Sequence, residues 1–100
     1  MSTRAHVASK YQVEFGTEYG VREFEDRRML LEELAEHFGV DLEMAWSDNE
    51  DWYEFPKSSL SRLYEKLSDN VPDEKETRIF IDELLGSGDP DIDYVRVEVW

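Results

Sequence analysis

Apolar and polar residues alternate with a period of two along several stretches of the chain, and this period is typical of strands with one buried face. Residues 5–15 form the longest such stretch, and they predict one continuous first strand. Residues 94–100 alternate in the same way and predict the last strand. Between them, residues 40–46 and 53–55 predict a β-hairpin whose acidic tip is residues 47–51.

Helical spacing of apolar residues appears between these stretches. Residues 22–38 carry their apolar side chains on one helical face, and Gly39 stands where a left-handed helix cap is wanted. Residues 58–68 predict a second, shorter helix. Pro72 fits the first position of a third helix that Gly86 would end. Part of this last segment also fits a short strand, so both structures stay open there.

The order strand, helix, two strands, one or two helices, strand predicts an α+β fold for a single domain of residues 1–100. We expect an antiparallel sheet of about four strands with two or three helices on one face. The order matches the split βαβ pattern of ferredoxin-like domains, in which the first strand is central and the last lies beside it. Other α+β topologies remain open.

The acidic balance of the chain limits its partners. Eleven basic residues stand against twenty-five acidic ones, and the net charge of −14 would repel a phosphate backbone or an anionic membrane. We therefore expect no direct nucleic-acid or membrane binding. The chain has no cysteine, which removes disulfides and thiolate zinc sites and favours the cytoplasm. No apolar run is long enough to span a membrane, and the first residues lack the apolar core of a signal peptide.

Catalytic residues are scarce. His6 and His37 are the two histidines, and neither lies in a recognisable nucleophile, zinc-protease, phosphate-loop or dinucleotide motif. We therefore predict no enzymatic activity and no cofactor.

The one candidate metal motif is a run of alternate aspartates, Asp89, Asp91 and Asp93, at the spacing that starts a calcium-binding loop. Tyr94 stands where the tight turn of that loop needs glycine, and Trp100 stands where the closing glutamate belongs. We interpret the run as a polar loop that enters a strand, and we do not expect calcium binding.

Aromatic residues give the functional prediction. If the helices cover one face only, alternation places Trp52, Tyr94 and Trp100 on the open face of the sheet, whereas Trp46 and Tyr53 belong to the core. Exposed aromatic residues on a sheet mark a partner surface. The sequence therefore predicts a small acidic protein-interaction module, without catalysis, that forms a homodimer through open faces or edge strands.

Two other functions fit the same sequence. Carboxylates spread over a rigid surface can imitate the phosphates of DNA, which would make the protein a DNA-mimic inhibitor of a DNA-binding protein. A cleft beside the sheet would instead make it a small-ligand-binding protein or an enzyme.

The opening segment Thr-Arg-Ala-His-Val-Ala-Ser-Lys-Tyr-Gln-Val-Glu-Phe-Gly, residues 3–16, resembles the first strand of small uncharacterised α+β proteins carried on bacterial mobile gene cassettes. The resemblance covers only this segment and includes no catalytic motif. It implies a bacterial origin and no particular function.

Overall fold

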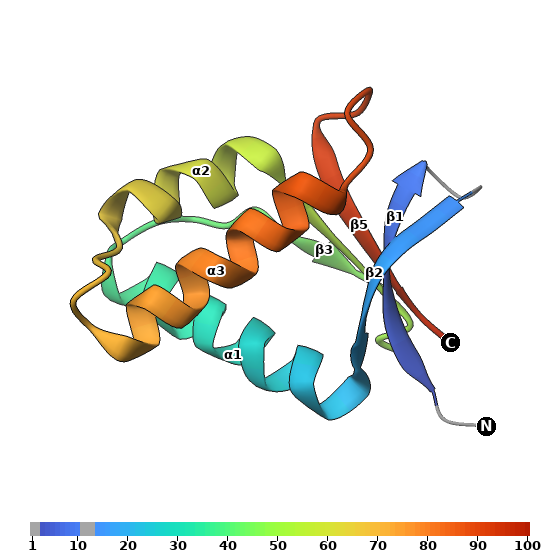
Figure 1. Ribbon diagram of the computed structural model, residues 1–100, viewed down its shortest axis with the longest axis horizontal. Coiled ribbons are helices and arrows are strands. Elements are labelled where there is room, and N and C mark those ends of the chain that lie inside the picture. Colours follow the sequence, from blue (N-terminus) through green and yellow to red (C-terminus); the bar gives the residue numbers. More distant parts are fainter. Residues whose placement is uncertain (1–2, 11–13) are drawn as a thin grey trace.

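The computed structural model describes residues 3–10 and 14–100 and shows an α+β fold with one antiparallel sheet and three helices (Figure 1). In chain order the elements are β1 (Arg4–Lys10), β2 (Glu14–Gly20), α1 (Val21–His37), β3 (Ala45–Trp46), β4 (Trp52–Pro56), α2 (Lys57–Lys66), α3 (Pro72–Ser87) and β5 (Tyr94–Val99). The predicted α+β class is confirmed.

The sheet has five strands in the order β2-β1-β5-β4-β3, and every neighbouring pair is antiparallel. The prediction of four strands with the first in the centre is wrong, because β5 occupies the middle. The last strand does lie beside β1, with Val7 opposite Val97. The ferredoxin-like order is therefore not the order of this sheet.

The predicted first strand is two strands in the structure. β1 ends at Lys10 and β2 runs back antiparallel to it from Glu14, while positions 11–13 lie outside the described residues. Gly16 and Gly20 both belong to β2. The register between the strands shifts on both sides of Ala8, and an irregular ladder of this kind accommodates glycine.

All three helices lie on the same side of the sheet (Figure 1). α1 and α3 pack against β1 and β2, and α2 packs against β4 and β5. The core between helices and sheet holds a group of aromatic rings: Phe24 of α1 lies 5.3 Å from Tyr53 and 6.1 Å from Phe80 between ring centroids. Further fully buried residues of this core are Leu31, Leu60, Leu63, Ile81, Leu84, Val95 and Val97.

The third helix is confirmed, and the short-strand alternative for residues 77–81 is wrong. Pro72 opens α3, and Asp73 and Glu74 lie in its first turn, where the helix dipole favours negative charge. Thr77, Phe80 and Ile81 are buried while Ile79 is 46 % exposed. The apolar run in this segment therefore follows a helical face and does not form a sheet strand.

Residues 40–44 do not form the strand that their alternation predicts. The Asp41 Oδ1 atom accepts a hydrogen bond of 2.9 Å from the backbone N–H of Glu43, whose φ of 51° is left-handed. This local turn takes the backbone out of extended geometry. Pairing begins only at β3, where Ala45 opposes Glu54 and Trp46 opposes Tyr53, which confirms the hairpin in shortened form.

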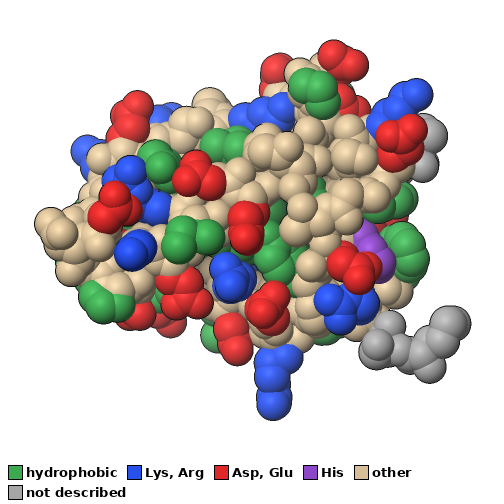
Figure 2. Space-filling view, in the orientation of Figure 1, with side chains coloured by type: hydrophobic (Ala, Val, Ile, Leu, Met, Phe, Trp, Pro, Cys, Tyr) green, Lys and Arg blue, Asp and Glu red, His purple; other side chains and the backbone are tan. Residues whose placement is uncertain are grey.

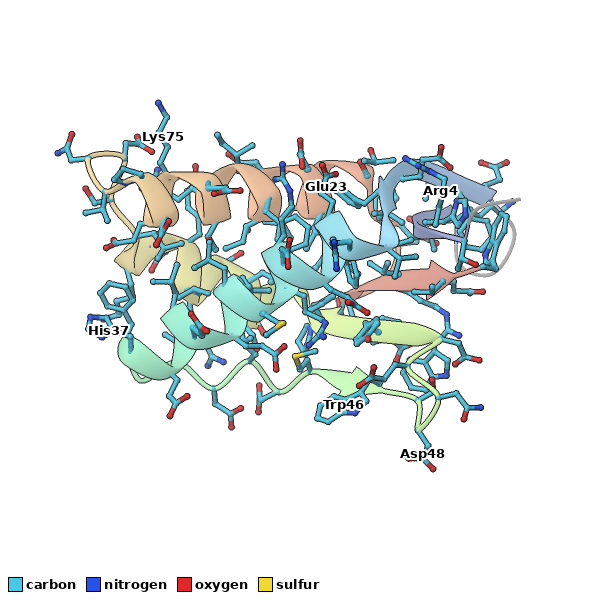
Figure 3. The ribbon with its side chains drawn as sticks, turned by 90° about the horizontal axis from the view of Figure 1, so that it is seen from below. Arg4, Glu23, His37, Trp46, Asp48 and Lys75 are labelled. Atoms are coloured by element: carbon cyan, nitrogen blue, oxygen red, sulfur yellow. The ribbon has the colours of Figure 1, made fainter. Side chains whose placement is uncertain are left out.

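Trp46 is on the helix side of the sheet but is not part of the core. Its side chain is 54 % exposed, because β3 is the outermost strand. Figure 3 shows Trp46 at the outer edge of the sheet, near the hairpin tip that carries Asp48. The prediction that Trp46 is a core residue is wrong, whereas Tyr53 and Phe55 are buried as expected.

The glycine after α1 gives a test of the fold. Gly39 has a φ of 70°, so Gly39→Ala is expected to lower the free energy of unfolding by about 1 kcal/mol, because a Cβ atom is strained in the left-handed region. Gly86 lies within α3 with open space around it, so Gly86→Ala is expected to raise stability by about 0.5 kcal/mol through helix propensity. Urea denaturation measures both, and equal effects of the same sign would contradict the assigned backbone geometry.

Candidate functional site on the open face of the sheet

The side of the sheet that faces away from the helices is called the open face below. Alternation along the strands defines it, because Val95, Val97 and Tyr53 point into the core and their neighbours point the other way. Register and ring contacts assign to it Arg4, His6, Phe15, Glu18, Trp52, Glu54, Tyr94, Arg96, Glu98 and Trp100.

An aromatic cluster forms where β1 meets the end of β5. The backbones of Arg4 and Trp100 exchange two hydrogen bonds of 2.9 and 3.0 Å, which extends the ladder by one pair beyond β5. The indole of Trp100 stacks on His6 with centroids 3.6 Å apart and 13° between the ring planes. Phe15 meets the same indole edge-on at 5.6 Å. Trp100 nevertheless remains 58 % exposed, so a large apolar surface faces outwards.

Both nitrogens of the His6 ring face oxygen acceptors, and in a neutral ring only the nitrogen that carries the proton donates a hydrogen bond. Nε2 lies 3.2 Å from the carbonyl oxygen of Trp100, and Nδ1 lies 3.3 Å from a carboxylate oxygen of Glu18. Glu18 also pairs with Arg4 at 3.1 Å. Because both nitrogens face oxygen atoms of the protein, the imidazole ring is held where it stacks on Trp100. Neither nitrogen is placed to act as a general base.

A second cluster surrounds Arg96 of β5. Its guanidinium lies 2.6 Å from Glu54 and 2.8 Å from Glu98, and it covers the ring of Trp52 at 4.8 Å. Burial works against the charge of Arg96, but the hydrogen bonds to Glu98 and Glu54 outweigh it and raise the pKa of the guanidinium. Its side chain is only 11 % exposed. The ionic groups therefore lie flat against the sheet and are already paired.

Trp52, Tyr94 and Trp100, the three aromatic residues predicted for an interaction surface, all point to the open face. They are not equivalent. Trp100 is well exposed at the β1 end, Trp52 is half-buried beside Arg96, and Tyr94 is partly exposed opposite Pro56 at the other end of β5.

Sequence reasoning missed the charged and imidazole groups that hold these rings. The alternation with Val95 and Val97 could have placed Arg96 on the open face, but no local pattern connects it with Glu54, which is 42 positions away. Alternation with Ala5 and Val7 predicts a polar strand face for His6, whereas in the structure it is 8 % exposed beneath an indole. Such burial depends on the cross-strand register.

The aspartate run does not gather ligands. Asp89 is buried, and its Oδ1 atom accepts a 2.8 Å hydrogen bond from the backbone N–H of Asp91. The Nζ atom of Lys57 donates to the carbonyl oxygen of Asp89 at 2.6 Å, which places a cation beside the turn. Among residues 3–10 and 14–100, no group of three or more metal-binding side chains could hold an ion.

The pKa of Tyr19 is strongly raised. The hydroxyl of Tyr19 donates a 2.8 Å hydrogen bond to Glu83 where β2 meets α3, with Arg27 beside its ring. Burial, followed by the bond and charge of Glu83, raises the pKa of Tyr19 well above its usual range. The phenol is thus stabilised as a neutral donor, which gives the group a structural role.

Comparisons with protein-family models, with curated proteins and with solved structures find no match for this chain. They leave the resemblance of residues 3–16 to gene-cassette proteins untested. No helix in the described part of the chain is both long and apolar enough to cross a membrane.

Replacement of the central cation tests the open-face ion pairs. Arg96→Met is expected to lower the free energy of unfolding by about 2 kcal/mol, because Glu54 and Glu98 are left close together without a cation. Arg62→Met is the control, since Arg62 pairs with Glu43 at 3.6 Å while 56 % exposed and is expected to change stability by less than about 0.5 kcal/mol. Equal losses in urea denaturation would refute the buried role of Arg96.

The shifted phenol predicts an alkaline effect on stability. Because the pKa of Tyr19 is raised on folding from about 10, its contribution is complete below pH 10 and is lost as the pH rises above that value. Tyr19→Phe is expected to lose about 1 kcal/mol at pH 7 and to show a smaller decline than the parent protein between pH 9 and pH 11. Urea unfolding curves at several pH values measure this, and parallel declines would show that Tyr19 is not the titrating group.

Proposed function

We propose that this protein is a non-catalytic binding module that associates with a second copy of itself through the open face. The observation that carries the proposal is that all three helices lie on one side of the sheet, while the other side presents aromatic rings among charges that are already paired. Proteins that expose aromatic surface of this kind use it for contact with a partner. The absence of cysteine fits action in the cytoplasm.

Charge distribution favours self-association on this face. With His6 neutral, the open face carries two cations, Arg4 and Arg96, against three carboxylates, a net charge of −1. The whole chain carries −14, so nearly all of the excess acid lies elsewhere. Two copies can therefore bring their open faces together with little local repulsion, although the remaining surfaces repel each other.

The cost of removing water from this face is also reduced. Glu18, Glu54 and Glu98 each have a basic partner within 3.1 Å, so contact with a second copy would bury ion-paired groups with one excess negative charge and would leave no carboxylate without a cation. Trp100 would contribute most apolar area, because it is the most exposed aromatic residue of the face.

The DNA-mimic alternative receives no specific support from the described surface. Mimicry needs an unbroken field of negative charge. On the face shown in Figure 2, acidic side chains alternate with basic ones over the helices, and the open face is nearly neutral. The two proposals differ in their response to salt, which provides the test.

Sedimentation velocity at tens of micromolar is the experiment. We expect a monomer–dimer equilibrium whose dissociation constant falls about threefold or more when NaCl rises from 50 to 500 mM, because salt screens the repulsion between two chains of −14. Trp100→Ala is expected to weaken the dimer about tenfold.

Trp46→Ala is the matched control, because Trp46 is a tryptophan of similar exposure, 54 %, on the opposite side of the sheet. It is expected to leave the dimer unchanged. A purely monomeric protein at every salt concentration would end the proposal, as would equal weakening by the two substitutions. Circular dichroism establishes that each variant is folded.

A further inference from the structure

A groove runs along the edge of the sheet between α1 and residues 40–46, on the side of the sheet opposite the open face. It is called the edge groove below and has a volume of about 420 Å³. Its apolar wall consists of Ala35, Val40, Leu42 and Met44, and Trp46 stands at the end nearest the hairpin. The irregular backbone of residues 40–44 creates the groove, because it leaves the last turns of α1 without a paired strand beside them.

The backbone of β3 is available along the same edge. The N–H of Ser47 donates to the carbonyl oxygen of Trp52 at 3.2 Å, so these two residues form a hydrogen-bonded pair. In an antiparallel ladder the next opposed pair, Trp46 and Tyr53, is then a pair without hydrogen bonds. The N–H and C=O groups of Trp46 therefore point away from β4, towards the free edge of the sheet.

Trp46 thus combines an outward backbone donor and acceptor with a half-exposed indole. Figure 3 shows it at the outer margin of the sheet, below α1 in that view. An extended segment from a partner could pair with these backbone groups and lay a side chain against the indole and the apolar wall. Strand addition of this kind obtains its affinity from backbone bonds and its specificity from side-chain pockets.

The rim of the edge groove is acidic. Glu32 and Glu36 of α1 face Asp41 and Glu43 across it, and no lysine or arginine lines it. Glu32 is paired with Arg28 from the preceding turn of α1.

Two of the remaining carboxylates are weakly held or unpaired. Glu43 meets Arg62 of α2 at 3.6 Å with both side chains more than half exposed. Glu36 has no ion-pair partner within the described residues. The groove therefore presents uncompensated negative charge beside apolar surface.

We propose that the edge groove binds an extended, lysine- or arginine-rich segment of another protein. The segment pairs with the backbone of Trp46, places one apolar side chain against Leu42, Met44 and the indole, and sets basic side chains near Glu36 and Glu43 from the same side of its backbone. Apolar and basic residues are therefore required two positions apart, because successive side chains of an extended segment point to opposite sides. This surface is separate from the open face, so the inference does not depend on self-association.

The probe is a seven-residue peptide with valine at position 4, lysine at positions 2 and 6 and serine elsewhere, so that valine and both lysines point to the same side of the extended backbone. It is titrated into the protein while the amides of the protein are observed by two-dimensional NMR. We expect chemical-shift changes in residues 40–46 and at the Trp46 indole N–H, with no change at Trp52 or Trp100. A lysine–serine peptide with serine in place of the valine has equal charge and is expected to bind about tenfold more weakly, because it lacks the apolar side chain. A peptide with glutamate in place of both lysines is expected not to bind.

Matched double variants distinguish the effect of the carboxylates in the edge groove from the effect of the net negative charge of the protein. Glu36→Gln with Glu43→Gln is expected to weaken binding about fivefold, and Trp46→Ala about tenfold. Glu25→Gln with Glu76→Gln removes the same two charges from exposed positions away from the groove and is expected to have less than a twofold effect.

Three results would overturn the proposal. Equal affinity for the lysine–serine peptide would show attraction by charge alone. Equal weakening by the two double variants would show that the carboxylates of the groove contribute no more to peptide binding than carboxylates elsewhere on the surface. Tighter binding of a helix-forming lysine–leucine peptide at the same residues would exclude the extended mode. Loss of self-association in the Trp100→Ala variant leaves the peptide result unchanged, so failure of one proposal is distinguishable from failure of the other.

Discussion

The aromatic core between the sheet and the helices is the constraint on which the rest of the molecule depends. Phe24 and Phe80, from two different helices, pack against each other and against rings of the sheet, and all are buried. Large rings cover a small sheet efficiently, but only if the helices that carry them lie on one side. The apolar faces of all three helices are used there, and within residues 3–10 and 14–100 no other helix covers the opposite side of the sheet.

No helix that the structure describes shields the open face from water, and ion-paired side chains that lie flat on the strands cover part of it instead. Arg96 links β5 to Glu54 of β4 and covers Trp52, and His6 supports Trp100. These contacts bury parts of two tryptophans without a second layer of structure. They also leave Trp100 exposed and the face close to neutral, which is why we assign self-association to this surface and not to the acidic remainder.

Backbone pairing differs between the interior strands β1 and β5 and the edge strand β3. Trp100 is added to the ladder opposite Arg4, so its ring is fixed by a full pair of backbone bonds. β3 is only two residues long, and the turn at Asp41 and Glu43 keeps the preceding chain from extending it. A short edge strand limits uncontrolled strand pairing, yet it also leaves one backbone position open for a selected partner. The acidic rim of the edge groove would provide that selection.

The sequence by itself determined the elements that depend on local chemistry. The helical period, Gly39 and Pro72 located all three helices, and alternation around Val95 and Val97 correctly separated the two faces of β5. Only the tertiary structure decided the sheet order, the division of residues 5–15 between two strands and the exposure of Trp46. A period of two tells which way a side chain points but carries no information about which strand lies next to it. Whether a residue is buried depends on that neighbour, and the pairing of Arg96 with Glu54, 42 positions away, exists only once the neighbours are in place.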